Sequence, residues 1–183
     1  MHSFHGILFI LVDWCTGVLR GLDAAGGEAD PVVKVADRRT FEGTVSVYLR
    51  AGVTAVVADR QTRVRDTGEQ VAAAGVVDTV EVVEWPERVR DPPESAVAAD
   101  ALGLYDEFID AVDAEPLVPF FESRSGAGSA DRVVDLPAIC VAYRIDGDLV
   151  GLYPRWRDGH HDSIEDCLRA LCTGERLRNL RPG

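Results

Sequence analysis

An Asp-Gly dipeptide, Asp146-Gly147, separates two apolar runs at residues 138–145 and 148–153. A two-residue type I′ turn requires a positive φ at both central positions, and Asp followed by Gly meets that requirement. The pattern therefore predicts a β-hairpin whose two strands are antiparallel.

A helix is expected after this hairpin, from about Asp162. Ser163 and Asp166 stand at capping-box spacing, and Gly174 is placed to end the helix. Its apolar residues recur at helical spacing: Ile164, Cys167, Leu168, Leu171 and Cys172.

A strand, helix and strand are expected earlier in the chain, at residues 44–49, about 59–74 and 79–85. In the first, Val45, Val47 and Leu49 alternate with less apolar residues at the period of a pleated strand. Gly75 is placed to cap the helix. Such a unit places its two strands parallel, with a right-handed crossover.

A second helix is expected between Pro92-Pro93 and Pro116, because apolar residues recur there at three- and four-residue spacing. Residues 117–135 show no regular period and are expected to form an insertion, with a surface loop at 125–130.

The resulting order, β-α-β-α-β-β-α from residue 44, predicts an α/β domain with a mixed central sheet flanked by helices. This order resembles the thioredoxin fold, most specifically at Leu136-Pro137 before an apolar strand. In thioredoxin-like proteins a cis proline stands there and faces a redox dithiol, so Pro137 is the matching position. Residues 50–55, where the dithiol should lie, contain no cysteine. The resemblance therefore implies a non-catalytic binding or regulatory module, and a glutathione-like thiol enzyme is a weaker alternative.

Three sequence blocks, at residues 119–122, 136–143 and 146–151, also resemble a family of haloarchaeal proteins. Members of that family often carry a helix-turn-helix label, which implies a transcription-associated regulator as the alternative function. The only stretch that could hold two short helices overlaps the strand-helix-strand unit, so the residues favour the thioredoxin-like module.

The charge is strongly acidic: 31 Asp and Glu against 19 Lys and Arg give a net charge of −12, and Lys34 is the only lysine. Such a surface repels itself in dilute buffer and is tolerated where salt screens within a few ångströms. This predicts a halophilic, cytoplasmic protein, although a GC-rich genome would bias the composition in the same direction. Direct nucleic-acid binding is disfavoured but not excluded.

The four cysteines, Cys15, Cys140, Cys167 and Cys172, form no CxxC pair, so reduced, mostly buried thiols are expected. His160-His161 could suggest a metal with Cys167 as third ligand, but adjacent side chains diverge and Cys167 is expected to face the core. No metal and no cofactor is therefore expected.

Residues 1–43 are expected to be an extension of the domain at 44–183. Their apolar run at 7–12 is too short to cross a membrane, and Asp13 and Arg20 interrupt the longer hydrophobic stretch. The extension could pack loosely on the domain, or translation could start further downstream.

The expected topology brings residues 50–54, Pro137 and residues 153–161 to one end of the sheet. We expect Arg155 and Arg157 to supply charge and Trp156 to stack on an anionic ligand or an acidic protein segment. Further candidates surround them: Arg50, Thr54, Pro137 and His160. The alternative is a solvated loop. No catalytic residue is nominated, since the chain lacks a Gly-x-Ser-x-Gly elbow and a phosphate-binding loop.

Overall fold

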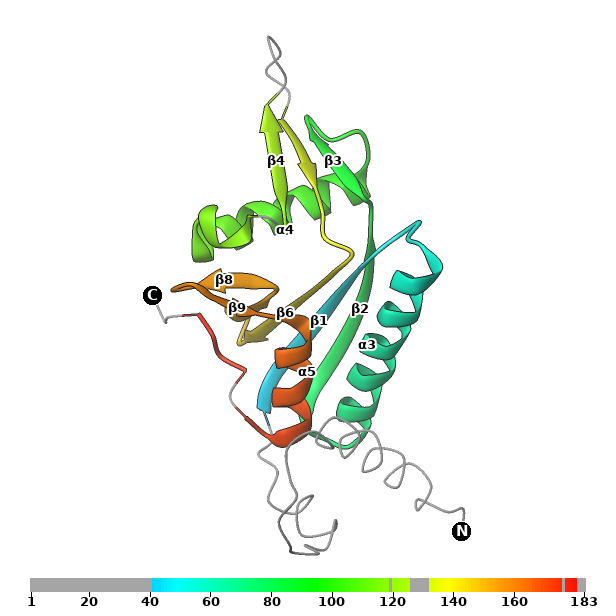
Figure 1. Cartoon of the computed structure of the whole chain (residues 1–183), viewed down its shortest axis with the longest axis vertical. Coiled ribbons are helices and arrows are strands. Elements are labelled where there is room, and N and C mark those ends of the chain that lie inside the picture. The colour runs from blue at the N-terminus through cyan, green and yellow to red at the C-terminus, as the bar shows by residue number, and fades with distance from the viewer. Residues whose placement is uncertain (1–40, 119, 126–131, 176, 181–183) are drawn as a thin grey trace, which may run out of the picture.

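A computed structural model describes residues 41–118, 120–125, 132–175 and 177–180 (Figure 1). The expectations for residues 1–40, for Cys15 and for residues 126–130 of the expected surface loop lie outside these residues, whereas Ser125 of that loop belongs to β4. The elements follow in the order β1 (Phe41–Arg50), α3 (Ala55–Ala73), β2 (Val77–Trp85), β3 (Arg88–Asp91), α4 (Ala96–Val112), the 3-10 helix η1 (Glu115–Leu117), β4 (Glu122–Ser125), β5 (Arg132–Asp135), β6 (Ile139–Ile145), β7 (Asp148–Tyr153), β8 (Arg155–Arg157), β9 (His160–Asp162) and α5 (Ile164–Thr173).

The main sheet has the strand order β2-β1-β6-β7. β1 runs parallel to β2 and antiparallel to β6, and β6 runs antiparallel to β7. The predicted α/β class, the mixed sheet and the helices that flank it are therefore confirmed. The turn between β6 and β7 has φ of 52° at Asp146 and 90° at Gly147, as a type I′ turn requires.

Helices cover both faces of this sheet (Figure 1). On one face Val47 and Val141 pack with Val64 of α3 and Leu171 of α5. On the other face Tyr48 packs with Phe108 of α4. Adjacent strand residues point to opposite faces, so β1 is apolar on both of them because both are covered.

Glycine ends two of the helices as expected. After α3 the Gly75 amide donates to the Ala72 carbonyl and the Val76 amide to the Val71 carbonyl, each at 2.9 Å, which is the Schellman arrangement. After α5, Gly174 adopts φ 72°. Ser163 and Asp166 form the predicted capping box at the start of α5.

A second, three-stranded antiparallel sheet in the order β3-β5-β4 corrects the expectation of an irregular insertion at 117–135. Its strands are short and charged, for example Arg-Val-Arg-Asp in β3, so no two-residue apolar period is long enough to be recognised. Its inner face buries Val89 and Val134 in the same cluster as α4, and this tertiary contact stabilises it.

Three local expectations were also wrong. α4 begins at Ala96 with Ser95 as its N-cap, not at Pro92-Pro93, and ends at Val112 before Asp113, whose φ is 67°. Residues 155–161, expected as a loop, form most of the β8-β9 hairpin. The cis prolines within the described residues follow Asp91 and Tyr153, so the Leu136-Pro137 bond is not cis.

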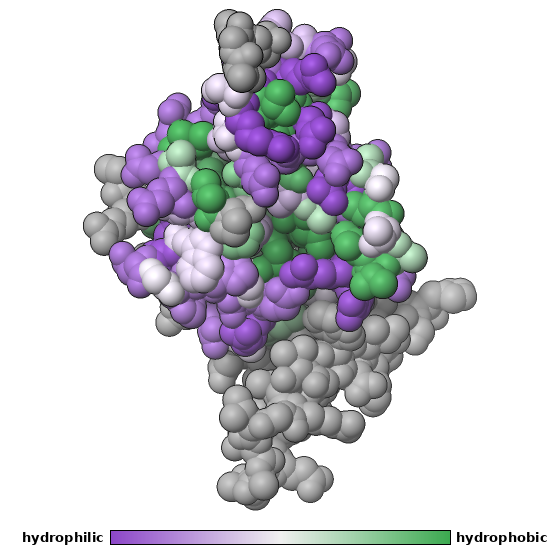
Figure 2. Space-filling view, turned by 45° about the horizontal axis from the view of Figure 1, so that its top comes forward, coloured by the Kyte–Doolittle hydropathy of each residue, from purple (hydrophilic) through white to green (hydrophobic). Residues whose placement is uncertain are grey.

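The described residues include no helix long and apolar enough to cross a membrane. On the face shown in Figure 2, hydrophobic residues are exposed in groups between hydrophilic ones. The large apolar side chains that are most exposed come from separate elements: Val56, Val97, Val118 and Trp156.

Candidate functional site: a pocket beside the β8-β9 hairpin

The β8-β9 hairpin presents the residues that the sequence singled out. Arg155 pairs with Asp162, Trp156 with His161 and Arg157 with His160 across the two strands. The turn is a second Asp-Gly dipeptide, with φ of 51° at Asp158 and 79° at Gly159. The same signal that predicted the β6-β7 hairpin therefore also specifies this one.

Asp162 is a buried carboxylate that collects several donors. Arg155 Nε lies 3.5 Å from its Oδ2, Arg157 Nε lies 3.4 Å from the same oxygen, and Asn179 Nδ2 donates to it at 3.0 Å. Arg155 is only 7% exposed, and its Nη2 also donates to the Asn179 carbonyl at 2.7 Å. Burial lowers the pKa of the Arg155 guanidinium, while Asp162 acts in the opposite direction. Arg155 therefore holds the hairpin to the C-terminal tail, in addition to lining the pocket described below.

That tail, residues 177–180, runs along β7. The side-chain amide of Asn179 makes two hydrogen bonds to Leu152 that a neighbouring strand would otherwise make. Its Oδ1 accepts from the Leu152 N–H at 3.0 Å, and its Nδ2 donates to the Leu152 carbonyl at 2.9 Å. Tyr153 Oη donates to the Leu177 carbonyl at 2.9 Å, and the Leu180 amide donates to Val150 O at 3.1 Å. The backbone groups on this side of β7 are thus partly satisfied by the tail.

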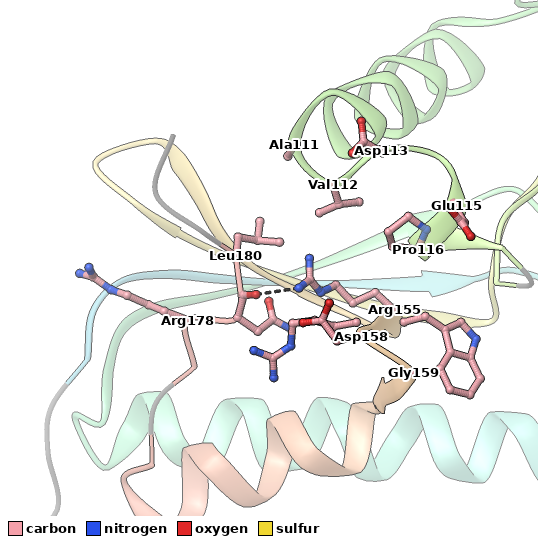
Figure 3. A pocket seen from close by; sticks show the side chains of 13 residues that line it. Ala111, Val112, Asp113, Glu115, Pro116, Arg155, Asp158, Gly159, Arg178 and Leu180 are labelled. Atoms are coloured by element: carbon pink, nitrogen blue, oxygen red, sulfur yellow. Dashed lines mark hydrogen bonds between the residues drawn. The ribbon is translucent and has the colours of Figure 1, made fainter.

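A pocket of about 770 Å³ opens between the end of α4, the hairpin and this tail (Figure 3). Its lining includes three arginines, Arg155, Arg157 and Arg178, and three carboxylates, Asp113, Glu115 and Asp158. Figure 3 shows the Arg155 guanidinium pointing into the space below Ala111 and Val112. The volume of the pocket is within the range of sites that bind small molecules.

Trp156 stands at the pocket beside a short aromatic stack. Its ring centroid lies 5.4 Å from that of His161, and His161 stacks on Phe120 at 5.0 Å with an interplanar angle of 15°. Trp156 is still 41% exposed. Contact with His161 supports the indole from one side while a large part of its surface stays open to a ligand.

The other predicted site residues lie elsewhere. Arg50 Nη1 donates to the Leu136 carbonyl at 3.4 Å, and the Pro137 carbonyl accepts from Trp85 Nε1 at 3.1 Å. Thr54 is the N-cap of α3 and makes no side-chain capping bond. None of these three residues lines the pocket, and neither does His160, which is exposed on β9. The structure thus brings together only part of the predicted set.

Two polar residues of these regions were not foreseen. Gln61 Nε2 donates to the carbonyls of Arg50 and Ala138 at 2.9 and 2.8 Å, so it bridges the end of β1 and the start of β6. Asn179 joins the tail to β7 as described above. No motif in the sequence marks either residue, because each bonds to backbone groups of other segments that come close only when the chain folds.

Two of the described cysteines, Cys140 and Cys167, are poorly suited to thiol chemistry. Cys140 and Cys167 are fully buried, and burial raises the pKa of both thiols. A reactive cysteine needs a lowered pKa and exposure, so neither thiol is suited to the glutathione-like alternative. In the part of the chain that the structure describes, no group of three His, Cys, Asp or Glu side chains could hold a metal ion.

Comparison with known proteins gives one finding. A family model described as a helix-turn-helix domain matches residues 37–176, which span the main sheet, the small sheet and all three α-helices described above. No curated protein and no solved structure matches the chain.

Proposed function

The chain belongs to the helix-turn-helix domain family, and from this membership we propose that it is a transcription-associated regulator. The observation that carries the proposal is the family match over residues 37–176. The match extends over every described element from β1 to α5, so the proposed role belongs to the domain as a whole.

The regulator acts through a protein partner and not through a recognition helix of its own. Such a helix needs a basic exposed side to meet the phosphate backbone. α3 carries three arginines and three acidic residues, α4 carries four acidic residues and no basic one, and α5 carries two acidic residues and one arginine. Among the described residues, moreover, every two successive α-helices are separated by strands.

Chromatin immunoprecipitation of the tagged full chain from its host, paired with binding of the purified chain to the recovered promoter DNA, tests this proposal. We expect enrichment at promoters in cells. For the purified chain we expect no promoter preference over random duplex DNA across a range of salt concentrations.

Absence of promoter enrichment would overturn the role in transcription. Tight, sequence-selective binding by the purified chain would instead overturn the partner-mediated mechanism and identify a DNA-binding protein.

A second candidate function is the binding of a small anionic ligand in the pocket beside the β8-β9 hairpin. The observation that favours it is the buried Arg155, whose Nη1 has no hydrogen-bond partner among the described residues and whose guanidinium points into the pocket (Figure 3). A guanidinium N–H that faces the pocket can donate to an anion there, and hydrogen bonds between charged partners are stronger than those between neutral ones. Calorimetric titration with inorganic phosphate tests for such binding.

A further inference from the structure

We propose that this pocket binds a flat aromatic ring that carries a phosphate group, the chemistry of a nucleoside monophosphate. The inference rests on the second candidate function, since it names the class of anion that the pocket takes. Three features support the inference: a partly exposed indole, guanidinium groups with N–H donors that face the pocket, and carboxylates that would repel a simple anion.

Trp156 is the platform for the ring. His161 lies against it, and Phe120 supports His161, so the fold holds the indole in place while Trp156 as a residue is 41% exposed. An aromatic ring that is already held loses little conformational entropy when a base stacks on it. Stacking of a base on an aromatic side chain is a main source of affinity in single-stranded nucleic-acid sites.

The arginines provide donors for the phosphate. Arg155 is fixed by Asp162 and Asn179 and presents its remaining amino group to the pocket. The Arg157 side chain is 48% exposed and can add a second guanidinium, whereas Figure 3 shows the Arg178 side chain extending away from Arg155. Guanidinium groups bind phosphate oxygens through paired N–H donors, which strengthens such contacts.

The carboxylates discriminate between ligands. Asp113, Glu115 and Asp158 line the same pocket and would repel a bare anion. They accept hydrogen bonds from the hydroxyl groups of a sugar or from the amino group of a base. A ligand with a phosphate at one end and hydroxyl or amino donors elsewhere can bond to both the guanidinium groups and the carboxylates. Inorganic phosphate can pair only with the guanidinium groups.

The test is calorimetric titration of the purified full chain with adenosine monophosphate, adenosine and inorganic phosphate, in parallel with tryptophan fluorescence. We expect adenosine monophosphate to bind at least about tenfold more tightly than either part alone, because ring and phosphate contacts add. We also expect it to change the fluorescence of Trp14→Phe and not of Trp14→Phe/Trp156→Phe, since Trp85, the tryptophan that both variants keep, is only 2% exposed.

Two variants locate the site. Trp156→Ala and Arg157→Gln should each weaken binding of adenosine monophosphate at least about tenfold. Arg63→Gln on α3 is the matched control for Arg157→Gln, because it removes the same charge from an exposed residue that forms no ion pair with another described residue. This control should bind like the wild type.

The outcomes separate the two proposals. Equal binding of inorganic phosphate and adenosine monophosphate would overturn the aromatic-phosphate inference and leave the anion site standing. Binding that both pocket variants retain would place the ligand elsewhere and overturn the inference. No binding of any of the three compounds would overturn the inference and the anion-binding function together.

Discussion

Gly151 lies where the C-terminal tail comes closest to the main sheet. A Cβ built on this residue would stand 2.6 Å from the Leu177 carbonyl oxygen and 3.3 Å from Tyr143 Cβ. Real Cβ atoms do not approach a backbone oxygen so closely, so any larger residue must push the tail away from β7. Glycine is required here for the close approach and not for its φ.

We expect Gly151→Ala to lower the free energy of unfolding by about 1–3 kcal/mol, as overpacking does. Gly103 is the matched control, because a Cβ added there meets nothing within 4 Å in α4. Gly103→Ala should be neutral or stabilising by up to about 1 kcal/mol, since Ala favours a helix. Denaturant unfolding measures both variants, and an equal effect at the two glycines would contradict the tail geometry.

The structural role of Arg155 could not be predicted from its residue type alone. Its place among Arg, Trp and His residues predicted a contact with an anionic ligand or an acidic protein segment, with a solvated loop as the alternative. Its partners Asp162 and Asn179 instead bury it. Asn179 follows α5 and lies 24 residues from Arg155 in the chain, so no local pattern indicates this contact.

At the scale of elements, α5 is fixed at its start by reciprocal hydrogen bonds. The Asp166 amide donates to Ser163 Oγ at 3.1 Å, and the Ser163 amide donates to Asp166 Oδ2 at 2.9 Å. Burial raises the pKa of the Asp166 carboxyl, but hydrogen bonds from Ser163 and the Arg169 guanidinium outweigh it and hold that pKa below its usual value.

This lowered pKa predicts a pH-dependent contribution of Asp166 to stability. The contribution is complete above the unfolded pKa of about 3.9 and is lost as the pH falls through the lower folded value. We expect Asp166→Asn to cost about 0.5–1 kcal/mol near neutral pH and progressively less below about pH 4. Unfolding curves of both proteins across this range measure the difference, and a cost that grows on acidification would contradict the assignment.

The small sheet is an element that tertiary packing stabilises. Val134 of β5 is 0% exposed and faces α4, whereas its neighbour Val133 belongs to the opposite face of the same strand. The β3 and β4 strands on either side are only four residues long. Strands this short depend on their buried face for stability.

We expect Val134→Ala to lower the free energy of unfolding by about 2 kcal/mol, from the lost burial of two methyl groups and the cavity left behind. Val133→Ala is the control and should cost less than about 0.5 kcal/mol. Thermal or denaturant unfolding distinguishes the two, and equal costs would mean that β5 does not pack on α4 as described.

At the scale of the whole molecule, the net charge of −12 affects the stability of the folded state. Many arginines already form ion pairs, such as Arg144 with Glu107 at 2.8 Å and Arg60 with Glu165 at 2.6 Å. The excess negative charge repels itself in the folded state and is screened by salt. This is the physical basis for our proposal of a halophilic setting.

We expect the Tm of the full chain to be higher by at least about 5 °C in about 2 M potassium chloride than in about 0.1 M, because the Debye length falls below the spacing of surface charges. An uncharged osmolyte at equal osmolarity is the control and should give a smaller rise. A Tm that does not change with salt would show that the acidic surface is not limiting for stability.

The order of the main elements followed from local patterns alone. Alternating valines specified β1, the Asp146-Gly147 turn specified the β6-β7 hairpin, and the Ser163 and Asp166 pair specified the start of α5. Each of these signals acts within a few residues, so it is present in the sequence before the chain folds. The parallel pairing of β1 and β2 then follows from the crossover between them.

By itself the sequence determined the central sheet, its hairpin and the acidic character of the surface. Only the tertiary structure decided that residues 117–135 contribute two strands to a second sheet, that Arg155 is buried against the tail, and that the pocket draws its lining from α4, the β8-β9 hairpin and residues 178–180. The physical reason is distance along the chain. A strand of four residues has too little intrinsic preference to form alone, and a single polar contact needs a partner. Both form only when remote segments fold together and supply a buried face or a hydrogen-bond partner.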